Sequence, residues 1–200
     1  MVQVAAIVVA AGQGVRAGGD LPKQFRRIAG ETLLRRALSS FVEAPAVSLV
    51  QPVIRSEDAE LVHTETAGLG VLPPVFGGVT RQSSVRAGLE ALLARKPDIV
   101  LVHDAARPFA SADLIARAIR AAEKTGAAIP GLPVTDTIKR VDGSGIVETT
   151  LDRSSLRLVQ TPQAFAFPAL IAAHRRAAEQ GRDEPPPRRV GGRWRACGGW

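Results

Sequence analysis

The feature that most limits how this chain can fold is a regular alternation of apolar runs with amphipathic stretches. The apolar runs, which predict buried strands, lie at residues 3–10, 48–55, 70–76, 98–103 and 127–130. We expect helices, with apolar side chains recurring at i, i+3 and i+4, at residues 31–44, 57–66, 80–93, 111–122 and 167–181. Repeated β-α-β units predict right-handed crossovers and a mostly parallel sheet flanked by helices. The predicted fold class is therefore α/β and Rossmann-like.

This alternation stops at about residue 136. Residues 136–158 are largely polar, with a Gly143–Gly145 turn between two β-prone stretches, and they predict a projecting β-arm. Because the arm has little of its own to bury, we expect it to pack against a second copy and form a homodimer. Residues 182–200 contain three consecutive prolines and four glycines without periodicity. We expect residues 1–181 to form one domain and residues 182–200 to form an irregular, disordered tail.

The composition and charge argue against nucleic acid and membranes as partners of this protein. The formal net charge is +7, but part of it comes from residues 182–200, where five arginines outweigh Asp183 and Glu184. The rest of the chain has no basic helix and no aromatic-basic platform, so we expect no nucleic-acid partner. The apolar run Val4–Ala11 is too short for a signal peptide or a membrane span. Cys197 is the single cysteine, which fits a reducing compartment, and we expect a cytoplasmic protein without a membrane partner.

The loop at residues 10–24 follows the first predicted strand. Gly12 and Gly14 have the spacing of a dinucleotide-binding fingerprint, but further glycines and Pro22 follow where that fingerprint requires a helix. A long glycine-rich loop that carries Arg16 and Lys23 is suited to a triphosphate, with backbone N–H groups and two cations on the phosphates. The alternatives are a surface loop with solvated charges and a dinucleotide-dependent oxidoreductase, which rests on the two glycines alone.

A carboxylate follows another predicted strand, in the sequence VHDAARPF. Asp104 at that strand end is a natural ligand for Mg²⁺, which prefers oxygen atoms of carboxylates and phosphates. Arg107 is expected to pair with Asp104 or with a substrate phosphate. His103 points to the opposite face and is expected in the core or as a cap. His63 and His174 lie on predicted helices without metal-ligand spacing, so the expected cofactor is Mg²⁺ rather than zinc.

Two further clusters leave alternatives open. Gly77, Gly78 and Ser84 precede a predicted helix, where they could bind an anion or a ribose or could serve as turn and cap. In the arm, Lys139 and Arg153 are either substrate contacts or solvated charges.

Five motifs occur in order along residues 3–181: AAGQGVRAGGDLPKQF, GGVTRQSSVRAGL, VLVHDAARPF, PVTDTIKRV and LDRSSLRLVQTPQAF. In sequence and spacing they resemble the 2-C-methyl-D-erythritol 4-phosphate cytidylyltransferases of isoprenoid biosynthesis. The resemblance implies a nucleotidyltransferase domain over residues 1–181 that transfers CMP from CTP to a sugar-alcohol phosphate and releases pyrophosphate. It also implies Mg²⁺ and a homodimer formed through the arm. The alternatives are a ribitol-5-phosphate cytidylyltransferase and an inactive nucleotide-binding or dimerising module.

The resemblance also implies roles for individual residues. Arg16 and Lys23 correspond to cations that stabilise the transition state, and Arg153 to the residue that orients the nucleophile. The contacts implied for CTP and Mg²⁺ are Ala10, Ala11, Gly12, Gly14, Gly78, Ser84, Asp104 and Ala105, with Asp104 as the metal ligand. The sugar-phosphate side is implied for Arg107, Thr137 and Arg153.

Two segments depart from the family pattern. Val79 stands where family members carry an acidic residue. Residues 182–200 stand where the family continues with a strand and a lysine-bearing substrate motif, and we expect turnover below that of a chain with that motif.

Overall fold

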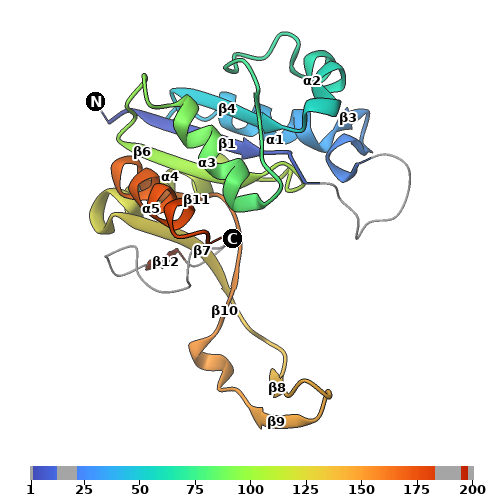
Figure 1. The fold of residues 1–200 in the computed structure, drawn as a ribbon, viewed down its shortest axis with the longest axis vertical. Coiled ribbons are helices and arrows are strands. Elements are labelled where there is room, and N and C mark those ends of the chain that lie inside the picture. The colour runs from blue at the N-terminus through green and yellow to red at the C-terminus, as the bar shows by residue number, and fades with distance from the viewer. Residues whose placement is uncertain (1, 13–21, 183–194, 198–200) are drawn as a thin grey trace.

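The structure, a computed structural model, describes residues 2–12, 22–182 and 195–197 (Figure 1). The strands of the main sheet are β1 (Val4–Val9), β4 (Leu49–Ile54), β5 (Val75–Phe76), β6 (Ile99–Asp104), β7 (Ala127–Pro133), β10 (Arg157–Val159), β11 (Gln163–Ala166) and β12 (Arg195–Cys197). Their order is β10-β7-β11-β6-β1-β4-β5, with β12 added on β7. Strand β1 pairs in parallel with β4 and β6, and β4 with β5, whereas β11 is antiparallel to both neighbours. The predicted α/β fold with a mostly parallel sheet is confirmed.

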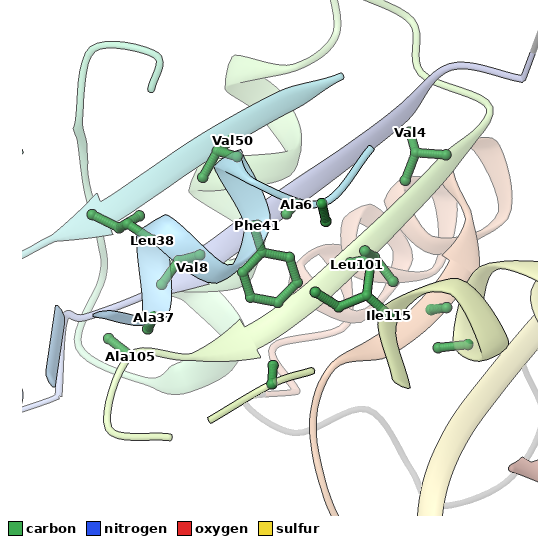
Figure 2. Packing of buried hydrophobic residues seen from close by; sticks show 14 of the residues in the cluster. Val4, Ala6, Val8, Ala37, Leu38, Phe41, Val50, Leu101, Ala105 and Ile115 are labelled. Atoms are coloured by element: carbon green, nitrogen blue, oxygen red, sulfur yellow. The ribbon is translucent and has the colours of Figure 1, made fainter. Parts of the chain in front are cut away.

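Helices cover both faces of the sheet. They are α1 (Leu33–Val42), α2 (Ala59–Thr66), α3 (Arg81–Ala91), α4 (Ala112–Thr125) and α5 (Phe167–Glu179). Successive side chains of a strand point to opposite faces, so Val4, Ala6 and Val8 of β1 belong to one buried cluster with residues of α1, α2 and α4. Figure 2 shows part of this cluster around Phe41 of α1 and Ile115 of α4. Ala5 and Ile7 pack with α3 and α5 on the other face. A strand covered on both sides must be apolar throughout, which explains the continuous run in β1.

Local capping sets where the helices begin and end. Helix α1 begins at Leu33 rather than at residue 31, because Thr32 is its N-cap and accepts a hydrogen bond from the Arg35 amide. Ser111 caps α4 as expected, and α4 ends at Gly126 in the left-handed conformation with φ of 78°. Within the described residues, no helix is both long and apolar enough to cross a membrane.

Strands β11 and β5 of the main sheet differ from the sequence prediction for reasons that the structure makes clear. Strand β11 was not predicted, yet it lies inside the sheet between β6 and β7 and buries Ala164 and Phe165. It has four residues and leads directly into α5, so neither alternation nor a turn marks it in the sequence. The strand predicted at residues 70–76 is reduced to Val75–Phe76, because Pro73 and Pro74 cannot donate ladder hydrogen bonds.

The arm projects from the body as predicted (Figure 1). Strands β8 (Lys139–Val141) and β9 (Val147–Thr150) form its hairpin. Most of the predicted tail, residues 183–194 and 198–200, lies outside the described residues. The expectation that no strand forms beyond residue 182 is wrong for Arg195–Cys197, which pair as β12 with residues 128–130 of β7. Strand β10 pairs with a different part of β7, residues 131–133.

Candidate active site

A cavity of about 660 Å³ opens at the carboxyl ends of β1, β4, β5 and β6. Loops at this edge of a parallel sheet are the usual ligand site of such folds. Among the residues predicted for the site, those that line the cavity are Ala10, Ala11, Gly12, Lys23, Gly78, Ser84, Asp104 and Ala105. The structure therefore brings together the three segments that the sequence analysis selected. Gly14 and Arg16 lie outside the described residues.

The walls of the cavity are fixed by backbone hydrogen bonds that continue the ladder past the strand ends. The Ala10 amide donates to the Val53 carbonyl at 2.7 Å, and the Ala105 amide to the Val9 carbonyl at 3.0 Å. The Gly77 amide donates to the Ile54 carbonyl at 2.7 Å. The sheet therefore fixes the positions of the loops that line the cavity.

Gly77 is where the first loop and the start of α3 approach each other. A Cβ atom at this position would lie 2.6 Å from Ala11 Cβ and 2.6 Å from Ser84 Oγ. The prediction that Ser84 precedes α3 is wrong: Ser84 lies inside the first turn, because the helix begins at Arg81 with Thr80 as N-cap. The Ser84 hydroxyl donates to the carbonyls of Thr80 at 2.9 Å and Gly78 at 3.2 Å.

Gln24 is a site residue that sequence reasoning missed. Lys23 and Gln24 share the short 3-10 turn Lys23–Phe25. Gln24 is buried, and its Nε2 donates to the Ala10 carbonyl at 3.0 Å and to the Gly12 carbonyl at 3.4 Å. These bonds tie the turn that carries Lys23 to the start of the glycine-rich loop. The only signal in the sequence is a polar residue beside the buried Phe25.

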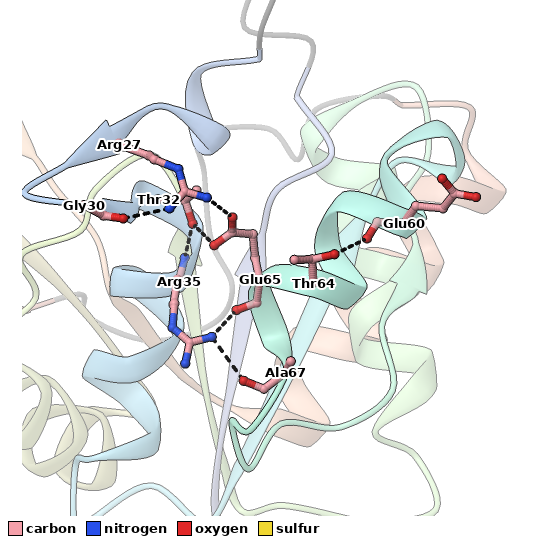
Figure 3. A network of polar contacts seen from close by, with 8 residues as sticks. All are labelled: Arg27, Gly30, Thr32, Arg35, Glu60, Thr64, Glu65 and Ala67. Atoms are coloured by element: carbon pink, nitrogen blue, oxygen red, sulfur yellow. Dashed lines mark hydrogen bonds and ion pairs between the residues drawn. The ribbon is translucent and has the colours of Figure 1, made fainter.

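A polar network holds the segment that follows Lys23 (Figure 3). The hairpin of β2 (Arg27–Ile28) and β3 (Glu31–Thr32) is bound to α2 through Glu65, whose carboxylate accepts from Arg27 at 2.9 Å and from Thr32 at 2.8 Å. Arg35 of α1 donates to the Glu65 carbonyl at 2.8 Å. The network anchors the far end of the Lys23 segment to two helices.

Asp104 lies in the cavity between two arginines. Arg81 donates from Nε to Asp104 Oδ1 at 3.0 Å, and Arg81 Nη2 lies 2.9 Å from the same oxygen. Arg107 Nε lies 3.5 Å from Oδ2. The Asp104 side chain is 31% exposed, so a ligand in the cavity can reach it. The predicted pairing with Arg107 is present, whereas Arg81, the first residue of α3, was not predicted.

His103 is a core residue, as expected from its orientation. It is fully buried against Phe41, with ring centroids 4.8 Å apart. Its Nε2 lies 2.8 Å from the Arg107 carbonyl oxygen, and its Nδ1 lies 2.9 Å from Thr161 Oγ1. Burial disfavours the charged ring and lowers the pKa of His103 to about 4.

The residues predicted for the sugar-phosphate side do not line the main cavity. Arg107 borders a separate hollow of about 140 Å³ and donates to Gln160 Oε1. Thr137 and Arg153 are exposed on the arm, where Arg153 donates to the Thr135 carbonyl. Lys139 donates to Thr150 Oγ1 across the hairpin at 2.6 Å, which is a contact within the arm.

Comparison with known proteins extends over nearly the whole chain. The family model described as IspD, 2-C-methyl-D-erythritol 4-phosphate cytidylyltransferase, matches residues 4–185. A bifunctional enzyme IspD/IspF from Rhodopseudomonas palustris is 58% identical over 182 residues, which are 91% of this chain and 46% of that protein. A protein of the same name from Nitrobacter hamburgensis is 57% identical, with 91% and 45% covered. The chain thus spans about half the length of the curated relatives it matches.

Solved structures have the same fold. The 4-diphosphocytidyl-2C-methyl-D-erythritol synthase of Anaerococcus prevotii is 28% identical, with a TM-score of 0.78 over 95% of this chain and 78% of that one. The 2-C-methyl-D-erythritol 4-phosphate cytidylyltransferase of Thermus thermophilus is 36% identical, with a TM-score of 0.68 over 90% and 78%. Since the family model covers residues 4–185, the chain belongs to the 2-C-methyl-D-erythritol 4-phosphate cytidylyltransferase family.

Proposed function

We propose that this chain is a cytoplasmic cytidylyltransferase that transfers CMP from CTP to 2-C-methyl-D-erythritol 4-phosphate and releases pyrophosphate. The observation that carries the proposal is the 660 Å³ cavity, where Lys23, Asp104 and the glycine-bearing loops face one space. The solved relatives that are 28% and 36% identical are named for this product or this reaction.

The reaction requires few protein groups. A phosphate oxygen of the acceptor attacks the α-phosphorus of CTP, and the bond from that phosphorus to the bridging oxygen of the β-phosphate breaks. Pyrophosphate leaves with the electron pair of the broken bond. The attacking oxygen is already anionic, so no general base is needed, and catalysis consists of positioning and charge neutralisation.

The cavity residues suit these two tasks. Backbone N–H groups of Ala11, Gly12 and Gly78 are suited to bind phosphate and ribose oxygens. We assign to the Lys23 ammonium, which lines the cavity, the neutralisation of charge that develops on the α-phosphate. We assign Arg16 the same role. The remaining CTP contacts that we assign are Ala10, Ala11, Gly12, Gly14, Gly78, Ser84 and Ala105.

Asp104 is the residue we assign to Mg²⁺. Mg²⁺ in nucleotide sites usually takes one or two carboxylates and completes its shell with water and phosphate oxygens, which fits one reachable carboxylate in this cavity. When bound, the ion supplies charge neutralisation to the triphosphate. To bind it, Asp104 would release Arg81 or Arg107, whose guanidinium could then bind a phosphate. One carboxylate thus links metal binding to the release of a cation.

We also propose a homodimer through the arm. The arm and its base expose five large apolar side chains: Val141, Ile146, Val147, Leu158 and Val159. Covering such side chains is the usual reason for association of two copies. We assign Arg107, Thr137 and Arg153 to the sugar phosphate, and we propose that Thr137 and Arg153, which are exposed on the arm, contact the acceptor in the cavity of a second copy.

Phosphorus NMR of the purified chain with CTP, Mg²⁺ and one acceptor at a time tests the function. With 2-C-methyl-D-erythritol 4-phosphate, we expect diphosphate resonances of the product and one pyrophosphate per CTP consumed. An Asp104→Asn variant, which keeps the side-chain volume, should lose most of this turnover. Turnover with ribitol 5-phosphate alone would contradict the proposed acceptor, and turnover with neither would contradict the proposed activity.

A further inference from the structure

The buried His103 connects two parts of the candidate site through a defined chain of hydrogen bonds. A backbone carbonyl only accepts hydrogen bonds, so the contact to the Arg107 carbonyl at 2.8 Å requires a proton on Nε2. Nδ1 of the neutral ring is then an acceptor, and the Thr161 hydroxyl must donate to it across 2.9 Å. With its proton committed, Thr161 Oγ1 accepts from the Asp104 amide at 3.4 Å. Each hydrogen bond in this series therefore has a defined donor and a defined acceptor.

This series of hydrogen bonds joins segments that are distant in sequence. His103 is the penultimate residue of β6, and Thr161 lies in the connection between β10 and β11, which leads back from the arm. The backbone N–H of the neighbouring Gln160 donates to the Pro130 carbonyl of β7 at 2.9 Å. The side-chain Oε1 of Gln160 accepts a hydrogen bond from the Arg107 guanidinium. The ring thus fixes both ends of the turn between Asp104 and Arg107 relative to the base of the arm.

We propose that His103 is a positioning residue of the transfer reaction: with Thr161, it holds the Asp104 carboxylate and the Arg107 guanidinium in a fixed relation. This inference rests on the function proposed above, in which Asp104 serves the nucleotide side and Arg107 the acceptor phosphate. His103 touches neither substrate, since its ring is fully buried. It acts by holding the Asp104 amide through Thr161 and the Arg107 carbonyl directly.

The ring nitrogens of the parent protein give a first test that needs no substitution. Nitrogen-15 NMR at neutral pH should show His103 with a protonated Nε2 and an unprotonated Nδ1. The opposite tautomer would overturn the chain of hydrogen bonds, and with it the proposal. This spectrum is independent of activity, so it distinguishes a failure of this inference from a failure of the proposed function, which would appear as a parent chain without turnover.

Thr161→Val removes the hydroxyl at nearly constant volume and tests the positioning role. A displacement of about 1 Å at reacting groups costs on the order of 100-fold, so we expect kcat to fall by about 10- to 100-fold. The KM for CTP should change far less, because the cavity residues that contact CTP are retained. The Nδ1 resonance should move as its donor is lost, and Thr161→Ser, which keeps the hydroxyl, should restore both kcat and the resonance.

Thr125→Val is the matched control. The Thr125 hydroxyl also bonds within the protein, to the carbonyls of Ala121 at 2.8 Å and Ala127 at 2.7 Å, but it does not line the cavity. This variant should lower the melting temperature and leave kcat unchanged. The positioning role is overturned if Thr161→Val moves the Nδ1 resonance while kcat stays at the parent value, or if Thr161→Ser is as impaired as Thr161→Val.

Discussion

Gly77→Ala should damage the site through a single methyl group. The new Cβ would lie 2.6 Å from Ala11 Cβ, 2.6 Å from Ser84 Oγ and 3.0 Å from Ser84 Cβ, whereas ordinary contacts of this kind are 3.4–4 Å. The Gly77 amide is held by the Ile54 carbonyl at 2.7 Å, so this residue cannot simply retreat. Either the loop that contains Ala11 or the first turn of α3 must therefore move by about 1 Å.

The size of the effect follows from this displacement. Overpacking of this kind costs about 1–3 kcal/mol, and a domain of this size loses about 2–4 °C in melting temperature for each kcal/mol. A misplacement of about 1 Å at a reacting centre can cost about 100-fold in rate. We expect kcat/KM for CTP to fall by one to two orders of magnitude, which is more than the loss of stability alone would cause in a folded protein.

Thermal unfolding and steady-state kinetics of three variants measure the losses in melting temperature and in kcat/KM. Gly70→Ala is the control, because a Cβ there meets no atom within 4 Å, and it should match the parent. Adding Ala11→Gly to Gly77→Ala removes one of the two clashes and should recover part of both losses, so the two substitutions should not be additive. If Gly77→Ala has the melting temperature and kcat/KM of the parent, the reasoning from loop contact is refuted.

Three more perturbations have defined outcomes. Lys23→Ala should lower kcat by about 100-fold or more while changing CTP affinity little, because lost electrostatic stabilisation acts on the transition state; an unchanged kcat would remove Lys23 from that role. Gly88→Ala should lower the melting temperature despite the better helix propensity of alanine, since its Cβ would lie 2.8 Å from Ile7 Cγ2 and 2.9 Å from Val53 Cγ2; a stabilised variant would show that α3 can shift. Burial, with the charges of Arg86 and Arg81, lowers the pKa of His174 from 6.5 to about 4, so the unfolded chain binds the proton first as pH falls. Stability should therefore drop by up to about 3 kcal/mol between pH 6.5 and 4, and denaturant titrations of His174→Gln should show a shallower pH dependence.

The sheet was predictable where its strands are covered on both faces. The run Val4–Val9 is apolar throughout because helices lie above and below it. Strand β11 has only four residues, of which the two central ones are buried, and its antiparallel insertion between β6 and β7 depends on long-range pairing. Strand β12 forms by pairing with β7, and no local sequence pattern predicts that pairing.

The sequence predicted which loops form the site, but it did not predict which side chains contact one another there. Glycines, Lys23 and Asp104 mark segments that follow strands, and the parallel topology brings such segments together. The partners of these residues come from elsewhere: Arg81 binds Asp104 from 23 positions away, and Thr161 binds His103 from 58 positions away. Such pairs depend on the three-dimensional arrangement of α3 and of the β10–β11 connection, about which residue type says nothing.

Calorimetric titration with nucleoside triphosphates tests the central claim that the 660 Å³ cavity is a CTP site. In the presence of Mg²⁺, CTP should bind at one site per chain and more tightly than ATP, and Asp104→Asn should weaken the Mg²⁺-dependent part of this affinity. Equal affinity for all four triphosphates, or no binding of CTP at all, would contradict the account.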